Sequence, residues 1–221
     1  MLKPKRKITR KEIKRDPFLE TIDKIENSYD KNKKLFLNFL LALIAGFFII
    51  NFLIKKNHQK NIDSNSALGI AMVAFENKDY ENAKFQFESI ISEFKRTVAF
   101  STANFYMGKI YFESNEYIKS ESFLNTFLSS GDTEVLHLGA IKMLTHIALQ
   151  NNEYDKAIKL LDSGLKNVSK NDSIDLRLIK TLVLKNQGNN DKAKSILDEI
   201  ISEKKLPRHL KQKSEEFIGM M

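Results

Sequence analysis

Four stretches of the sequence follow one pattern, and together they decide the fold. They are AFENKDYENAKFQFESII at 74–91, YFESNEYIKSESFLNTFL at 111–128, ALQNNEYDKAIKLLDSGL at 148–165 and LKNQGNNDKAKSILDEII at 184–201. Each contains the end of an apolar segment, a polar turn, and a second segment with apolar residues at helical spacing. The turns close on Tyr80, Tyr117, Tyr154 and Asn190. These residues are 37, 37 and 36 positions apart, and such a fixed period predicts an array of stacked helix pairs.

A small residue follows each turn by three positions. These residues are Ala83, Ser120, Ala157 and Ala193. A bulky side chain at a close helix crossing would force the helix axes apart, so small residues belong there. The pattern resembles the tetratricopeptide repeat over residues 64–207, and the resemblance implies antiparallel helix pairs with an aromatic residue closing each turn. The sequence departs from that family at Thr145 and Thr181, where Gly or Ala is usual, and in a period longer than the usual 34 residues.

Residues 208–221, after Pro207, predict one more short helix with Leu210 and Phe217 facing inward. The ends of a solenoid need a cap with one polar face, and this helix is the candidate for it. The predicted fold class is therefore all-α: an N-terminal transmembrane helix, then a tetratricopeptide-like α-solenoid of about four helix pairs, then a capping helix.

The segment 35–54, LFLNFLLALIAGFFIINFLI, contains twenty residues and no charge. At about 1.5 Å per residue, a helix of this length spans roughly 30 Å, the thickness of a bilayer core. A cleaved signal peptide would have a shorter apolar region ending in small residues, so an uncleaved anchor fits better. Ala42 and Gly46 have the spacing of a helix-packing pair, but one such pair often arises by chance in an apolar run.

The charge of the chain is concentrated before this segment. Residues 1–34 carry twelve Lys or Arg and six Asp or Glu, whereas residues 55–221 carry twenty-four and twenty-two. The bias predicts a cytoplasmic basic segment at 1–34, with a short amphipathic helix around Phe18 to Tyr29, and a repeat domain on the other side of the membrane. Residues 55–63 are expected to link the anchor to the repeats.

In the tetratricopeptide family, the first helix of each pair lines a concave surface. The resemblance places a partner-binding groove at Asn65, Leu68, Met72, Phe75, Phe105, Lys109, Phe112, Lys142, His146, Leu149, Leu178 and Leu182. This set predicts an apolar trough with a cationic middle, suited to an extended or helical peptide with apolar anchors. The alternative is that several of these Phe and Leu residues pack against the neighbouring repeat. Leu68 and Met72 stand where the chaperone-adaptor branch of the family holds a C-terminal carboxylate with Asn and Lys, which argues against that mode.

The sequence predicts no enzyme, cofactor or metal site. Cysteine is absent, which excludes disulfides, cysteine-ligated zinc and a thiol nucleophile. The histidines have no metal-ligand spacing; they are His58, His137, His146 and His209. No glycine-rich phosphate loop or nucleophile motif occurs. The near balance of charges in the repeats also argues against nucleic acid as a partner.

The layout of a short basic segment, one anchor and tetratricopeptide repeats resembles the ancillary SecYEG translocon subunit family of bacterial inner-membrane proteins. The resemblance implies a single-pass protein with a periplasmic repeat domain, acting as a scaffold in translocation or envelope assembly, with the translocon or periplasmic chaperones as partners. One alternative is a cytoplasmic regulatory or assembly adaptor tethered to the membrane. Another is a self-associating protein whose trough is filled by its own C-terminal segment. The partner and the oligomeric state stay open at this point.

Overall fold

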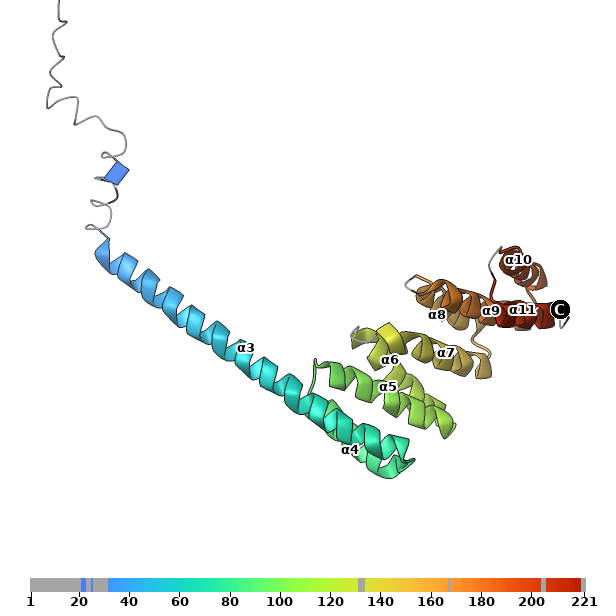
Figure 1. Cartoon of the computed structure of the whole chain (residues 1–221), viewed down its shortest axis with the longest axis horizontal. Coiled ribbons are helices and arrows are strands. Elements are labelled where there is room, and N and C mark those ends of the chain that lie inside the picture. The colour runs from blue at the N-terminus through green and yellow to red at the C-terminus, as the bar shows by residue number, and fades with distance from the viewer. Residues whose placement is uncertain are drawn as a thin grey trace, which may run out of the picture. The chain divides into compact units, whose positions relative to one another are not determined.

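The computed structural model describes residues 21, 22, 25, 32–130, 134–166, 168–203 and 206–219. Over these residues the chain consists of helices and turns and contains no strand (Figure 1). The amphipathic helix predicted around Phe18 to Tyr29 lies almost wholly outside them. The chain divides into two compact units, Met1–His58 and Gln59–Met221, which are described one at a time.

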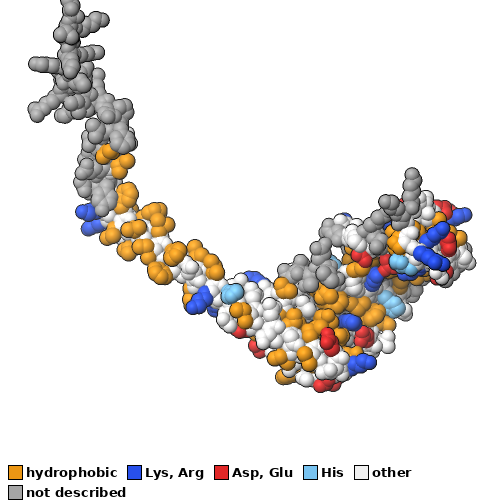
Figure 2. Space-filling view, in the orientation of Figure 1, with side chains coloured by type: hydrophobic (Ala, Val, Ile, Leu, Met, Phe, Trp, Pro, Cys, Tyr) orange, Lys and Arg blue, Asp and Glu red, His pale blue; other side chains and the backbone are white. Residues whose placement is uncertain are grey.

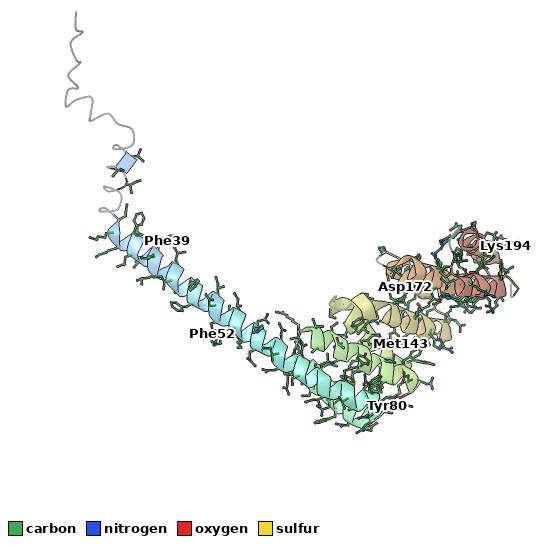
Figure 3. The ribbon with its side chains drawn as sticks, in the orientation of Figure 1. Phe39, Phe52, Tyr80, Met143, Asp172 and Lys194 are labelled. Carbon is green, nitrogen blue, oxygen red and sulfur yellow. The ribbon has the colours of Figure 1, made fainter. Side chains whose placement is uncertain are left out.

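The described part of the first unit is dominated by the start of α3, a helix over Lys33–Glu76. The predicted apolar segment lies within this helix, and its large side chains project outward, as Phe39 and Phe52 do in Figure 3. Figure 2 shows the segment as a nearly continuous hydrophobic band with basic side chains at both ends. The helix is long and apolar enough to cross a membrane, and none of its most apolar stretch is buried.

Residues 55–63, expected as a linker, are helical and belong to α3. Their sequence, KKNHQKNID, contains neither Pro nor Gly to end a helix. The side chains of Gln59 and Asp63 form a hydrogen bond of 2.9 Å, at the i,i+4 spacing that supports a helix. The division between the anchor and the repeats is therefore not marked by a break in secondary structure.

The second unit contains four helix pairs and a final helix. The end of α3 pairs with α4, and the later pairs are α5 with α6, α7 with α8, and α9 with α10. The helices after α3 are α4 (Tyr80–Glu93), α5 (Val98–Glu113), α6 (Tyr117–Ser130), α7 (Glu134–Gln150), α8 (Tyr154–Gly164), α9 (Lys170–Asn186), α10 (Asn190–Ile201) and α11 (Arg208–Gly219). Each predicted turn-closing residue is the first residue of the second helix of its pair.

The turn inside each pair has the same backbone structure in all four units. The residue two positions before each turn-closing residue has a positive φ; these residues are Lys78, Asn115, Asn152 and Gly188. The next residue donates its amide to a carbonyl five positions back, as from Asp79 to Ala74 (3.0 Å) and from Asn189 to Leu184 (2.8 Å). This arrangement is a Schellman motif, which ends a helix, and only Gly188 adopts the left-handed conformation without a steric penalty.

The small residues after the turns lie where the two helices of a pair cross. Ala83, Ser120, Ala157 and Ala193 are all fully buried. The hydroxyl of Ser120 donates a hydrogen bond of 2.8 Å to the carbonyl of Gly108 on the facing helix. A Cβ at Gly108 would lie 2.6 Å from Cγ of Leu124, so a glycine is required at this crossing. The predicted reason for the small residues is therefore confirmed.

Apolar clusters join each helix pair to the next. The first cluster includes Ala71 of α3, Phe87 of α4 and Met107 of α5. The last joins α9 and α10 to α11, with Leu178 and Leu210 among its buried members. The helix α11 therefore packs on the last pair, with Leu210 buried and Phe217 partly buried as predicted for a cap.

Candidate protein-binding groove

The predicted groove residues lie on the first helices of the pairs: the end of α3, α5, α7 and α9. The repeat register of 37, 37 and 36 residues places them at equivalent positions along these helices. One set of equivalent residues is Met72, Lys109, His146 and Leu182. A second is Phe75, Phe112 and Leu149. A ligand lying across the four helices would meet these sets in turn.

The twelve predicted residues differ in accessibility. Asn65 and His146 are exposed. The half-buried residues are Leu68, Met72, Phe75, Lys109, Phe112, Lys142, Leu149 and Leu182. Phe105 and Leu178 are only 6% and 0% exposed and belong to the clusters between pairs. These two side chains pack in the core instead of lining an accessible surface, because α6 and α7 cover Phe105 and α10 and α11 cover Leu178.

Rings on successive first helices contact one another, although Tyr106 is not a predicted groove residue and also packs against the apolar clusters between the pairs. The ring centroids of Phe75 on α3 and Tyr106 on α5 are 4.9 Å apart, and those of Phe112 on α5 and His146 on α7 are 5.3 Å apart. The Nζ atom of Lys109 lies 5.3 Å from the centroid of Phe75, within the range of a cation–π interaction. The accessible candidates of the first three pairs thus form a mainly aromatic and apolar row.

The cationic middle predicted from the sequence is partly neutralised. Lys142 on α7 forms an ion pair with Asp175 on α9, and the Nζ atom of Lys213 on α11 lies 2.7 Å from the other carboxylate oxygen. Burial raises the pKa of the Asp175 carboxyl, but the hydrogen bonds from Lys142 and Lys213 outweigh it and hold the pKa below the ordinary value. Lys109 has a more distant acidic neighbour, Glu113, at 3.9 Å.

The architecture agrees with a comparison of the sequence with known families. The model of the tetratricopeptide repeat-like domain matches residues 27–205. The chain belongs to the tetratricopeptide repeat-like family. A search of curated proteins gave no match. The matched range includes all four repeats and also the apolar segment 35–54, and tetratricopeptide repeat-like domains generally bind other proteins.

The tetratricopeptide repeat-like register identifies a groove position that the sequence analysis missed. Asp175 lies 36 residues after Gly139 and therefore occupies the position that Asn65, Thr102 and Gly139 occupy in the earlier repeats. Its side chain is 22% exposed and holds two cations from two other helices. Extending the period from Asn65 to the fourth repeat would have found the position, but not its ion pairs, which depend on α11.

The C-terminal helix covers the fourth-repeat end of the groove. Leu210 of α11 shares a buried cluster with Leu178, and Lys213 of the same helix bonds to Asp175. Part of the predicted trough is therefore occupied by the chain itself at this end. The accessible row on α3, α5 and α7 has no such contact with α11 among the described residues.

A separate hollow of about 470 Å³ lies between α8, α9 and α10. Its lining is Asp155, Ile158, Lys180, Leu184, Gln187, Asn189, Lys192, Ser195 and Ile196. The side chain of Lys180 is bound to Asp162 at 2.6 Å, and that of Gln187 to Asp155 at 2.9 Å. The hollow is therefore lined in part by polar side chains that are already paired with one another, unlike a mainly apolar binding site.

Proposed function

We propose that this chain is a single-pass membrane protein whose repeat domain, outside the cytoplasm, binds apolar segments of other proteins. The observation that carries the proposal is the exposure of the apolar part of α3. Every large apolar side chain of 35–54 is at least 45% exposed, from Ile44 at 45% to Leu35 at 68%. Exposing so much apolar surface to water is unfavourable, at about 25 cal/mol per Å², whereas a bilayer core provides the environment that these side chains require.

The proposed orientation rests on the basic residues. Lys31, Lys33 and Lys34 immediately precede the apolar segment, and eight more Lys or Arg lie within residues 1–15. The segment after the anchor has Lys55, Lys56 and then a mixture of both signs. The excess of positive charge on the N-terminal side favours a cytoplasmic N-terminus. In a bacterial cell this would place the repeats on the periplasmic side of the inner membrane.

The proposed binding mode follows from the accessible row. Phe75, Phe112 and Leu149 offer apolar contacts at one repeat interval, and Lys109 and His146 lie beside them. Aromatic side chains provide large contact areas with few rotatable bonds, which suits recognition of an extended or helical segment. Newly translocated chains and envelope-assembly factors present such segments before they fold. We infer that the role is binding and not catalysis.

Topology mapping tests the membrane half of the proposal. Because the chain contains no cysteine, Asn151→Cys in the exposed turn before α8 and Asn32→Cys before the apolar segment give single labelling sites. Asn151 is preferred to Asn152, whose φ of +59° disfavours a cysteine. An impermeant maleimide should label N151C in cells with a permeabilised outer membrane, and N32C only after the inner membrane is opened. The opposite pattern would favour the membrane-tethered cytoplasmic adaptor, and release by alkaline carbonate would refute the anchor.

Peptide binding tests the groove. A fluorescent peptide with two apolar anchors and one acidic residue should bind the purified full chain, and Phe112→Ala should weaken that binding. The matched control is Phe85→Ala, because Phe85 is 71% exposed on α4, the second helix of its pair. Equal loss of affinity in both variants, or in neither, would contradict the assignment of the groove to the first helices.

A further inference from the structure

The N-terminal end of the repeat array presents an apolar face on α3. Ile62, Ile70 and Val73 are 49%, 58% and 60% exposed, and the small residues Ser66 and Gly69 lie between them on the same side of the helix. Their spacing, 62, 66, 69, 70 and 73, marks one continuous stripe of an α-helix. Ala71 and Ala74 point away from the centre of the stripe and are buried in a cluster with residues of α4 and α5. We refer to the five residues as the N-terminal face.

The repeat register shows what this face is built to contact. Adding 37 to Ile62, Ser66, Ile70 and Val73 gives Ala99, Ala103, Met107 and Ile110 on α5. All four are at most 3% exposed and belong to the cluster that packs against the first helix pair. Adding 37 again gives a set whose last three members, Ala140, Leu144 and Ile147, are buried against the second pair. In the second and third units, therefore, this position contacts the preceding unit.

The part of α3 that belongs to the first repeat also has the composition of a helix covered on both sides. Residues 64–75, SNSALGIAMVAF, include no charged residue, although five of them are exposed. The final helix shows the contrast, because the exposed side of α11 carries Lys211, Gln212, Glu215 and Glu216. Solenoid ends that face water normally carry such polar residues. The N-terminal face thus has the character of an interface, although no described element packs on it.

We propose that the N-terminal face binds the same face of a second copy of this chain. An uncharged apolar stripe is complementary to itself, as a two-fold symmetric contact requires, and it places no like charges together. Ser66 and Gly69 would permit a close approach of two helices, and a Cβ at Gly69 has no heavy atom within 4 Å in the monomer. The spacing of 62, 66, 69 and 73 alternates four and three, as in parallel helix dimers.

The proposal rests in part on the proposed function. If residues 35–54 cross a bilayer, two copies leave the membrane in the same direction, and the N-terminal face lies soon after the anchor on the same helix. Confinement in one membrane raises the effective concentration of the two faces, so a contact of modest area suffices. The same topology puts residues 1–34 across the bilayer, where they cannot cover the face.

Cysteine cross-linking in native membranes tests the contact. Ser66→Cys and Gly69→Cys, introduced separately into the cysteine-free full chain, should each form a disulfide-linked dimer under mild oxidation. Asn61→Cys is the matched control, since Asn61 is exposed on the same helix but lies off the stripe. Dimers from S66C and G69C, and none from N61C, are expected. Equal cross-linking at all three positions, or none at S66C and G69C, would overturn the proposal.

A charge placed in the stripe gives a second test. Ile70→Glu should abolish the S66C cross-link, because two carboxylates would then be buried together in the contact. Ile118→Glu, at a position on α6 that is 90% exposed, should leave the cross-link unchanged. Equal helix content by circular dichroism for both variants would show that the loss is not due to unfolding.

Two further outcomes separate the proposals from each other. A chain that resists carbonate extraction but gives no S66C or G69C dimer in native membranes refutes the dimer and leaves the anchor in place. A cross-link from S66C to a protein of another mass also refutes the second copy as the occupant. A chain that carbonate releases refutes the proposed function, and S66C cross-linking of that released protein then tests the dimer independently.

Discussion

The two ends of the repeat array differ although each is formed by a helix packed on a neighbouring one. At the C-terminal end, α11 buries Leu210 against the last pair and turns charged residues to the outside. At the N-terminal end, α3 buries Ala71 and Ala74 but leaves Ile70 and Val73 more than half exposed. The C-terminal end therefore presents charged residues to solvent, whereas the N-terminal end has the apolar composition of an interface. The repeat register reveals this difference, because it shows which role the equivalent positions have in the other repeats.

This difference has a simple physical basis. Each unit of a solenoid contributes two apolar faces, and only the units inside the array have both faces covered by neighbours. A terminal unit must either replace apolar residues by polar ones or bury its outer face against something else. The fourth pair buries its face against α11, in a cluster with Leu178 and Leu197. The first pair keeps apolar residues on a face that no described element covers.

The largest expected effect is at the C-terminal cap. Leu210→Ala should lower the free energy of unfolding by about 2–5 kcal/mol, because it leaves a cavity beside Leu178, whose side chain is fully buried. Ile218→Ala on the same helix removes a side chain that is 44% exposed, and its effect should remain below about 1 kcal/mol. Thermal unfolding followed by circular dichroism measures both. Similar losses for the two variants would mean that α11 does not cap the array in solution.

A smaller effect on stability distinguishes a helix crossing inside the array from the exposed N-terminal face. Gly108→Ala puts a methyl group 2.6 Å from Cγ of Leu124 and 3.3 Å from its amide nitrogen, so it should destabilise the fold by about 1–3 kcal/mol. Gly69→Ala meets nothing within 4 Å and should instead stabilise α3 by up to about 1 kcal/mol through helix propensity. Opposite signs of the change in melting temperature are expected. When both variants are measured as monomers, a loss from G69A equal to that from G108A would show that the N-terminal face is packed within one chain.

Much of this architecture could be predicted from the period alone. The turn-closing residues and the small residues after them take their predicted places, because both are set by contacts within one helix pair. The predicted groove is less well determined. Phe105 and Leu178 proved to be core residues, since the neighbours of a first helix decide which of its sides is open. The open side depends on how successive helix pairs are rotated relative to one another. The residue spacing within one pair does not determine that rotation.

The ion pairs between distant helices could not be predicted from the sequence either. Lys142 was predicted as a groove cation, but the paired residues Asp175 and Lys213 lie 33 and 71 positions further along the chain. Nothing in a local pattern indicates that α7, α9 and α11 bring these three side chains together. The helical state of 55–63 is different, because the absence of Pro and Gly from that segment was visible and predicts continuation of the helix.

The smallest expected effect concerns the ion pairs that hold the cap. Asp175→Asn keeps the shape of the side chain but removes the charge that binds Lys142 and Lys213, and should cost about 1 kcal/mol at neutral pH. The value is modest because both lysines are at least about a third exposed to solvent. Lys211→Gln is the matched control, since Lys211 is exposed on the outer side of α11 with only Glu215 nearby at 3.9 Å. Hydrogen exchange should quicken in α11 for D175N and not for K211Q.

The pH dependence of this effect is fixed by the direction of the pKa shift. The pKa of Asp175 is lower in the folded protein than in the unfolded chain, so its carboxylate contributes stability above the ordinary aspartate pKa of about 3.9. That contribution disappears as the pH falls through the lower pKa of the folded state. The difference in stability between the natural chain and D175N should therefore be constant near neutrality and shrink below about pH 4. A difference that persisted in full at the acid end, or that vanished already near pH 6, would mean that the Asp175 charge is not what holds α11 on the last helix pair.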